Sequence, residues 1–89
     1  MILKKLLNYC IKIFKMQPIG RIIQEELRRQ ERTVVWLARH LCCDRSNVYD
    51  IFKRQTIDCE LLFRISTVME HNFFEDLAKE FSEILLLKP

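Results

Sequence analysis

Glycine and proline are nearly absent from this sequence, which has one glycine and two prolines among its 89 residues. The tight turns of β-sandwiches and β-barrels usually need these residues, so their scarcity argues against both folds. No segment alternates apolar and polar residues long enough to indicate a strand. Hydrophobic residues make up 49% of the chain, which is enough for one small core. The composition therefore predicts an all-α protein with one small domain.

The four cysteines lack the spacing of a metal site. Cys42 and Cys43 are adjacent, Cys10 and Cys59 stand alone, and there is no CxxC pair. The two histidines have no ligand spacing either, so no zinc and no other cofactor is expected. A disulfide framework would need a secreted chain, and the N-terminal residues lack a signal-peptide cleavage site. We therefore expect free thiols and a cytoplasmic location.

Motifs typical of catalysis are also missing. The sequence has no glycine-rich phosphate loop, no HExxH motif and no nucleophile with a matching base. Glu25, Glu26 and Glu31 stand among arginines at helical spacings, which surface ion pairs explain. His40 and His71 are expected to be surface residues. The protein is therefore not expected to be an enzyme.

The net charge of +3 hides an uneven distribution along the chain. Residues 1–15 carry four lysines and no acid, and residues 16–56 carry eight basic and five acidic residues. Residues 57–89 carry three basic and seven acidic residues. A basic front and an acidic back favour one surface that faces an anion such as nucleic acid.

Residues 1–15 predict a basic amphipathic helix, with the four lysines and Asn8 inside one arc of about 100°. Three interpretations stay open. The helix lies on an anionic membrane surface, or it packs on a partner or on the domain itself, or Met16 is the true start of the protein. We therefore divide the chain into an N-terminal extension, 1–15, and a domain, 16–89.

Five short helices are predicted within that domain. Their start and stop signals are Pro18, Thr33, Asp44, Asp58 and Asn72. Apolar residues that recur at helical spacing predict the core faces. These residues are Ile19, Ile22, Ile23, Leu27, Val34, Leu37, Ala38, Leu41, Val48, Ile51, Phe52, Leu61, Leu62, Ile65, Met69, Phe74, Leu77, Ala78, Phe81, Ile84 and Leu85.

The second and third predicted helices are joined by a very short turn, between Cys42 and Asp44. Helices joined so tightly must cross at a steep angle. The crossing needs a small residue on the second helix, which Ala38 supplies. It also needs apolar residues on the inner side of the third helix, which Val48 and Ile51 supply. An alanine with apolar residues ten and thirteen positions later is the spacing of a helix-turn-helix.

The motif lies in Thr33 to Arg54, TVVWLARHLCCDRSNVYDIFKR. This segment resembles the phage-repressor (Cro/XRE-type) helix-turn-helix family. The longer segment ERTVVWLARHLCCDRSNVYDIFKRQTID is similar to very small helix-turn-helix regulators of Bacteroides-type bacteria. The resemblance implies a five-helix, lambda-repressor-like DNA-binding bundle, here with an extra N-terminal amphipathic helix. One departure is Cys42, which stands where the family usually has a left-handed glycine, at a cost of about 1 kcal/mol.

The resemblance places the third helix in the major groove of double-stranded DNA. The expected base contacts are Arg45, Ser46, Asn47, Tyr49 and Asp50, and the expected phosphate contacts are Thr33, Lys53 and Arg54. Arginine suits guanine, asparagine suits adenine, and serine suits either. Asp50 is an acid that faces a polyanion. We expect it to pair with Lys53 or Arg54, and the alternative is that it accepts from a cytosine amine.

The sequence thus predicts a small bacterial or phage-type transcriptional regulator that binds DNA sequence-specifically. One module makes few contacts, so a homodimer on two half-sites is expected. Its expected contact surface on the last helix is Phe81, Ile84, Leu85 and Leu86. The alternative is a protein-interaction module, antitoxin-like or a regulatory partner, that keeps the fold without specific DNA binding.

Overall fold

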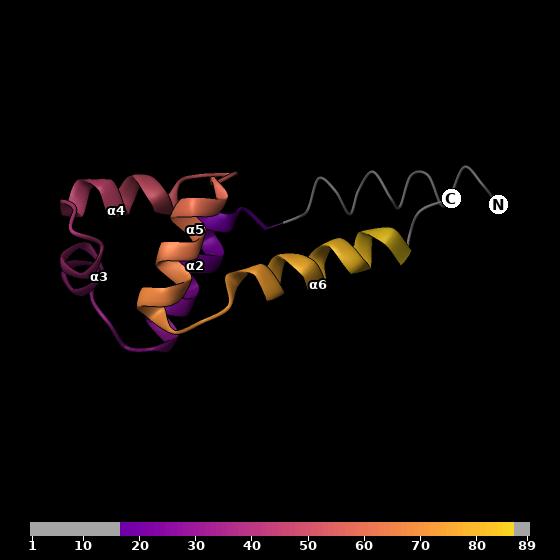
Figure 1. Cartoon of the computed structure of the whole chain (residues 1–89), viewed down its shortest axis with the longest axis horizontal. Helices are drawn as coiled ribbons and strands as arrows, with labels where there is room; N and C mark the ends of the chain where they lie inside the picture. Colours follow the sequence, from indigo (N-terminus) through magenta and orange to yellow (C-terminus); the bar gives the residue numbers. More distant parts are fainter. Residues whose placement is uncertain (1–16, 87–89) are drawn as a thin grey trace. The chain divides into compact units, whose positions relative to one another are not determined.

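The computed structural model describes residues 17–86, and every regular element in that range is a helix. The helices are α2 (Ile19–Arg29), α3 (Val34–Leu41), α4 (Arg45–Phe52), α5 (Cys59–Met69) and α6 (Phe73–Leu86) (Figure 1). The all-α prediction is confirmed for these residues. The predicted helix in residues 1–15 lies outside the described range. Within that range, no helix is long and apolar enough to cross a membrane.

The helices belong to two compact units. One unit, Gln17–Phe73, contains α2 to α5 and the first residue of α6. The remaining residues of α6, from Phe74 onward, belong to the other unit. In the first unit α4 packs against α2 and α3, and α3 also packs against α5. Its buried apolar side chains are Ile19, Ile23, Leu27, Leu37, Ala38, Leu41, Val48, Ile51, Leu62, Ile65, Met69 and Phe73. All of them except Phe73 lie on the apolar stripes that the sequence predicted.

The predicted start signals of α2, α3 and α5 are confirmed. The Thr33 hydroxyl oxygen accepts from the Trp36 N–H at 3.1 Å, and the Asp58 carboxylate accepts from the Leu61 N–H at 2.8 Å. Both contacts are side-chain caps that satisfy a backbone donor in the first turn. Pro18 directly precedes α2, where its missing N–H costs no hydrogen bond.

Left-handed residues end α2, α3 and α5, and none of them is a glycine. Glu31, Cys42 and Glu70 have φ angles of 58°, 57° and 51°. Each sits in a Schellman arrangement, in which two backbone N–H groups past the helix end donate back to carbonyls of its last turn. Asn72 lies in the break between α5 and α6, as predicted, but the left-handed residue that ends α5 is Glu70.

The turn between α3 and α4 consists of Cys42, Cys43 and Asp44. Cys42 is left-handed, as expected for a residue that stands where glycine would be easier. The Cys43 N–H donates to the Ala38 carbonyl at 2.9 Å, which closes the end of α3. Asp44 occupies the N-cap of α4, but its side chain makes no capping hydrogen bond. Its backbone carbonyl accepts from the Asn47 N–H at 3.0 Å instead.

The glycine of this chain holds α2 against the end of α4. A Cβ atom on Gly20 would lie 2.3 Å from the Ile51 carbonyl oxygen and 2.5 Å from that of Phe52. The Gly20 N–H donates to the Arg54 carbonyl at 3.1 Å. Glycine is therefore needed here for a close backbone approach and not for a turn. The contact fixes the position of α2 relative to α4.

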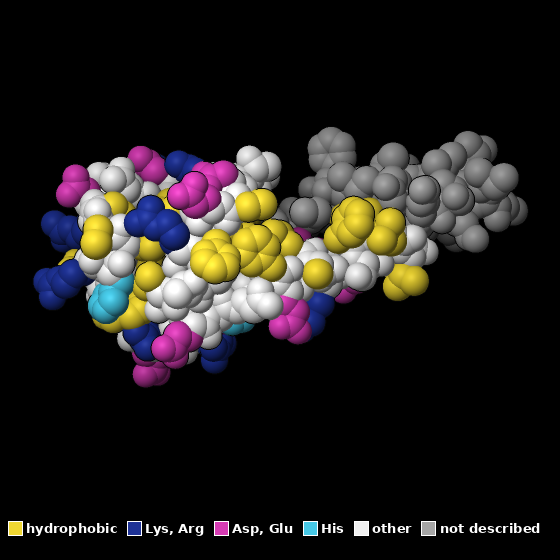
Figure 2. Space-filling model, in the orientation of Figure 1, with side chains coloured by type: hydrophobic (Ala, Val, Ile, Leu, Met, Phe, Trp, Pro, Cys, Tyr) yellow, Lys and Arg dark blue, Asp and Glu magenta, His cyan; other side chains and the backbone are white. Residues whose placement is uncertain are grey.

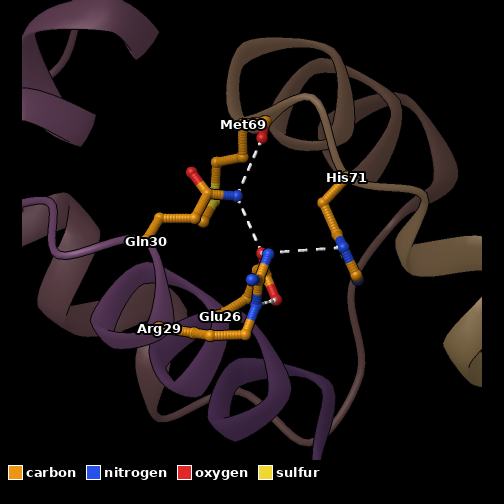
Figure 3. A network of polar contacts seen from close by, with 5 residues as sticks. All are labelled: Glu26, Arg29, Gln30, Met69 and His71. Carbon is orange, nitrogen blue, oxygen red and sulfur yellow. Dashed lines mark hydrogen bonds and ion pairs between the residues drawn. The ribbon is translucent and has the colours of Figure 1, made fainter.

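A buried carboxylate joins α2 to the segment that follows α5 (Figure 3). Glu26 is only 8% exposed. Its oxygens accept from Arg29 Nε and Gln30 Nε2, both at 2.8 Å. Gln30 Nε2 also donates to the Met69 carbonyl at 2.9 Å, and His71 Nδ1 lies 3.6 Å from Glu26 Oε2. The Arg29 hydrogen bond is the largest cause of the lowered pKa of Glu26, and burial opposes it.

The network corrects two expectations. Glu26 does pair with an arginine of its own helix, but it is buried and not a surface residue. His71 is half-buried and faces that carboxylate, whereas the sequence placed it on the surface. Both errors have one physical cause, because the contact joins segments that lie far apart in the sequence.

Candidate nucleic-acid interface

The surface of α4 is apolar on one side and polar on the other. Val48 and Ile51 are 0% and 5% exposed and face the core. The exposed residues of α4 and of the two positions after it are Arg45, Ser46, Asn47, Tyr49, Asp50, Lys53 and Arg54. These are the predicted base contacts together with two of the predicted phosphate contacts. Their exposure is confirmed, and their contact with DNA stays a prediction.

Basic side chains gather near this surface. Figure 2 shows several Lys and Arg side chains over the end of the unit that α3 and α4 form, with some Asp and Glu side chains beside them. Such a cluster attracts anions and speeds their association. The first turn of α4 contains no acidic residue, but Asp44 at its N-cap and Asp50 on its exposed face oppose the attraction.

The N-terminal end of α3 carries the third predicted phosphate contact, Thr33. Its hydroxyl oxygen serves as the cap of α3, while the hydroxyl hydrogen remains able to donate to an acceptor. Next to it, Trp36 is half-buried and contacts two side chains. The guanidinium of Arg32 lies 3.9 Å from its ring centroid, and the His40 ring stacks on it at 4.3 Å. His40 is exposed, as expected.

Asp50 is not neutralised as the sequence predicted. Within residues 17–86 it makes no ion pair with Lys53 or Arg54, so that expectation is wrong. All three side chains are exposed, and an exposed pair gains little against the entropy of ordering two side chains. Asp50 instead lines a groove beside Asn47 and Arg54.

This groove lies between α4 and α5, and we call it the α4–α5 groove. It is lined by Leu41, Cys43, Asn47, Asp50, Ile51, Arg54, Leu61 and Arg64. Arg64 Nη2 donates to the Leu41 carbonyl at 3.3 Å, which ties α5 to the end of α3. Burial is the largest cause of the raised pKa of the Cys43 thiol, and the Asp44 charge adds to it. The groove thus combines an apolar floor with two guanidinium groups and one carboxylate.

A second groove lies between α2 and α4, and we call it the α2–α4 groove. It is lined by Pro18, Arg21, Gln24, Glu25, Arg28, Phe52 and Lys53. Glu25 is its acid, and it lies 3.5 Å from the Arg21 guanidinium in an exposed pair. Arg28 and Lys53 make no ion pair with any residue in the described range. The groove therefore has a surplus of positive charge.

The two grooves flank the exposed face of α4. At about 100° per residue, Asn47 and Asp50 point to one side of α4, and Phe52 and the C-cap residue Lys53 point to the other. The centres of the two sets are roughly 140° apart around the helix axis. Ser46 lies on the arc between them. The exposed face of α4 is therefore bordered on each side by a groove that contains basic groups.

Sequence reasoning missed the arginines that come to the grooves from other helices, which are Arg21, Arg28 and Arg64. A weak signal was available, because α2 has more arginines than acids. It did not reveal the grooves, since a groove forms only when separate helices pack. Arg64 is ten residues beyond Arg54 in the sequence, and nothing local indicates that they share a groove.

The described residues hold no cluster of three or more His, Cys, Asp or Glu side chains that would bind a metal ion. Cys42, Cys43 and Cys59 are free thiols. The chemistry offered by this surface is therefore that of guanidinium, ammonium, amide, hydroxyl and carboxylate groups. In comparisons with known proteins, no model of a protein family, no curated protein and no solved structure matches the chain.

Proposed function

We propose that this protein binds double-stranded DNA sequence-specifically, with α3 and α4 as a helix-turn-helix of the phage-repressor (Cro/XRE) type. The observation that supports this best is the short turn with its left-handed Cys42, followed by a helix that is buried only on its inner side. Val48 and Ile51 cover that inner side. A helix fits into the major groove of B-form DNA, which is about 12 Å wide. We therefore propose α4 as the helix that enters it.

The base contacts follow from the chemistry of the exposed side chains. Arg45 suits the O6 and N7 atoms of guanine, Asn47 suits adenine, and Ser46 suits either base. Tyr49 is 51% exposed, and its ring meets Phe52 edge-on. Its ring is proposed to contact a thymine methyl group, or its hydroxyl to donate to a phosphate. Asp50 has neither predicted partner, which favours the other interpretation, that it accepts from the amino group of cytosine.

The phosphate contacts of this proposal are Thr33, Lys53 and Arg54. Thr33 directly precedes α3, and Lys53 and Arg54 directly follow α4. Along the chain, these contacts therefore lie before and after α4, which we call the reading helix. Contacts of this kind orient a protein on the duplex but carry no sequence information. Occupancy of a site near a promoter would then block or recruit polymerase, as a small bacterial or phage-type regulator does.

A homodimer is part of the proposal, because two copies would read two half-sites about 34 Å apart. Of the expected dimer surface, Ile84 is only 5% exposed, so it is not available to a partner. An exposed stripe on α6 replaces it. Phe74, Ala78, Phe81 and Leu85 are exposed with spacings of four, three and four residues, as in a helix that packs on another helix.

Selection of bound sequences from a random duplex library tests the function. We expect one motif to be enriched, and a palindromic motif if the dimer binds. Arg45→Ala should relax the preference at one base pair by about 1–3 kcal/mol. Lys53→Ala should weaken binding to all sequences alike. Enrichment of no motif, or identical binding by wild type and Arg45→Ala, would exclude the proposed role of α4.

A second candidate function is a protein-interaction module that keeps the fold without specific DNA binding. The observation that favours it is the exposure of large apolar side chains in both units, with Phe63 67% and Phe81 58% exposed. The same library separates the two functions, because an interaction module enriches no DNA motif at any salt concentration.

A further inference from the structure

We infer that the α2–α4 groove and the α4–α5 groove bind the two phosphate strands of the duplex, one strand in each groove. The inference rests on the proposed function and deepens it. It assigns phosphodiester binding to side chains outside the reading helix, namely Arg21 and Arg28 of α2 and Arg64 of α5. These residues have no other assigned role in DNA binding.

The geometry of the duplex provides the first step. The major groove is bounded by one sugar-phosphate strand on each side, so a helix inside it has a line of negative charge along each flank. Duplex DNA carries one such charge per about 1.7 Å of its axis. The two grooves border α4 on opposite sides of its exposed face, so each groove would meet one strand.

The charges of the α2–α4 groove provide the second step. Arg21, Arg28 and Lys53 line it, against Glu25 as its acid. The Arg21–Glu25 pair is 3.5 Å long with side chains that are 68% and 53% exposed. Such an exposed pair is weak, so Arg21 can turn to a phosphate at little cost.

The backbone contact between α2 and α4 makes this groove a fixed site. Gly20 lies one residue before Arg21, and its N–H donates to the carbonyl of Arg54, one residue after Lys53. The backbones that carry the two cations are thus joined by a direct hydrogen bond. The spacing of the backbone at Arg21 and Lys53 is therefore set before DNA binds, and only the side chains have to be ordered on binding.

The α4–α5 groove offers a guanidinium that is already oriented. Arg64 Nη2 donates to the Leu41 carbonyl at 3.3 Å. A guanidinium has five N–H donors, so this bond holds the group in place and leaves further donors for a phosphate. Arg54 adds a second positive charge to this groove, and the carboxylate of Asp50 offsets one of the two. This groove should therefore hold its strand less strongly than the α2–α4 groove.

Salt titrations of DNA binding test the inference. The full chain is titrated with a selected duplex and with a scrambled duplex, and fluorescence anisotropy reports binding over a range of salt concentrations. The variants are Arg21→Gln/Arg28→Gln for one groove and Arg64→Gln for the other. Arg39→Gln is the matched control, because Arg39 is exposed on α3 and lines neither groove. Like Arg64→Gln, this variant removes one positive charge.

The slope of log K against log salt should fall by about 0.9 per lost phosphate contact. We expect a fall of about 1.8 for the double variant and about 0.9 for Arg64→Gln, with no change for Arg39→Gln. The ratio of affinities for the selected and scrambled duplexes should not change. Arg64→Gln also loses its contact with Leu41, so circular dichroism must show an intact fold. If it does not, Arg54→Gln tests the same groove.

Three results would overturn all or part of the inference in distinguishable ways. If the wild type prefers the selected duplex but the groove variants keep its slope, the grooves do not bind phosphate and the proposed function stands. If the wild type binds neither duplex, the proposed function fails and the groove assignment fails with it. A lower slope in Arg39→Gln that equals that of Arg64→Gln would mean a general charge effect, which also excludes the α4–α5 groove as a specific phosphate site.

Discussion

The backbone N–H of Gly20 donates to the carbonyl oxygen of Arg54 at 3.1 Å, across 34 positions of sequence. This hydrogen bond joins the first turn of α2 to the residues that follow α4. It is possible only because residue 20 has no side chain, since a Cβ atom there would lie 2.3 Å from the Ile51 carbonyl oxygen. The arginines of α2 are thereby held beside the proposed reading helix.

Replacement of this glycine should therefore be costly. Alanine is favoured over glycine inside a helix by about 1 kcal/mol, so propensity alone would make Gly20→Ala stabilising. The clash with backbone atoms reverses the sign, and we expect a loss of about 1–3 kcal/mol, as for other overpacked sites. Urea unfolding followed by circular dichroism measures it. Gln24→Ala, at an exposed position of the same helix, is the control and should change stability little.

The left-handed helix ends provide the opposite prediction. Cys42→Gly should stabilise the protein by about 1 kcal/mol, because glycine adopts the observed φ of 57° without a steric cost. Cys43→Gly is the matched control. Its φ is not positive, so glycine there should destabilise the fold by freeing the unfolded chain. Thermal unfolding of the two variants compares them directly. Equal stability of both would mean that Cys42 carries no backbone strain.

The features that could be predicted from sequence are those set by near neighbours. Thr33 and Asp58 cap helices through hydrogen bonds to residues three positions away. Such caps can be predicted because the side chains of Ser, Thr and Asp carry an oxygen that accepts from a backbone N–H. Cys42 was expected to be left-handed because it stands where the helix-turn-helix family that this segment resembles usually has a left-handed glycine, and its φ is 57°. The exposed face of α4 followed from helical periodicity, since Val48 and Ile51 define its buried side.

The features that were missed depend on contacts between distant segments. The Gln30 amide reaches the Met69 carbonyl at 2.9 Å, and no local pattern reveals that pairing. Periodicity also failed on α6, where Phe81 is 58% exposed and Ile84 only 5%. That helix has apolar residues on more than one face, and periodicity does not tell which face is covered. The grooves beside α4 were missed for the same reason, because each needs a second helix.

Acid should weaken the fold through Glu26. Its pKa is lowered from the ordinary value of 4.5, first by the hydrogen bond from Arg29. A carboxyl with a lowered folded pKa stabilises the protein above its unfolded pKa, and this contribution is lost as pH falls through the folded pKa. Stability should therefore decrease below about pH 4.5. Urea unfolding at a series of pH values measures the effect.

Glu26→Gln isolates that contribution. The neutral side chain cannot titrate, so the difference in stability between wild type and variant should be largest near pH 7 and should shrink below about pH 4.5. At pH 7 the loss should be about 1–3 kcal/mol, because the variant leaves buried polar partners incompletely satisfied. The exposed Glu25→Gln is the control. A pH-independent difference would show that the charge of Glu26 does not stabilise the fold.

Asp50 should act in opposite directions on affinity and on specificity. It lies in the α4–α5 groove with two arginines, and its negative charge opposes the approach of a phosphate strand. Asp50→Asn should therefore strengthen binding to every duplex. It should also lower the discrimination at one base pair by about 1–3 kcal/mol, because the cytosine amine loses its charged acceptor. Anisotropy titrations on a set of single-base variants of the selected duplex measure both effects.

Glu60→Gln separates the local role of Asp50 from its effect on net charge. Glu60 is exposed in the first turn of α5 and lines neither groove, and the variant removes one negative charge. It should strengthen binding less than Asp50→Asn and leave base preference unchanged. If both variants raise affinity equally and both keep the preference at every base pair, Asp50 contacts no base. The acid on α4 would then affect DNA binding only through the net charge of the protein.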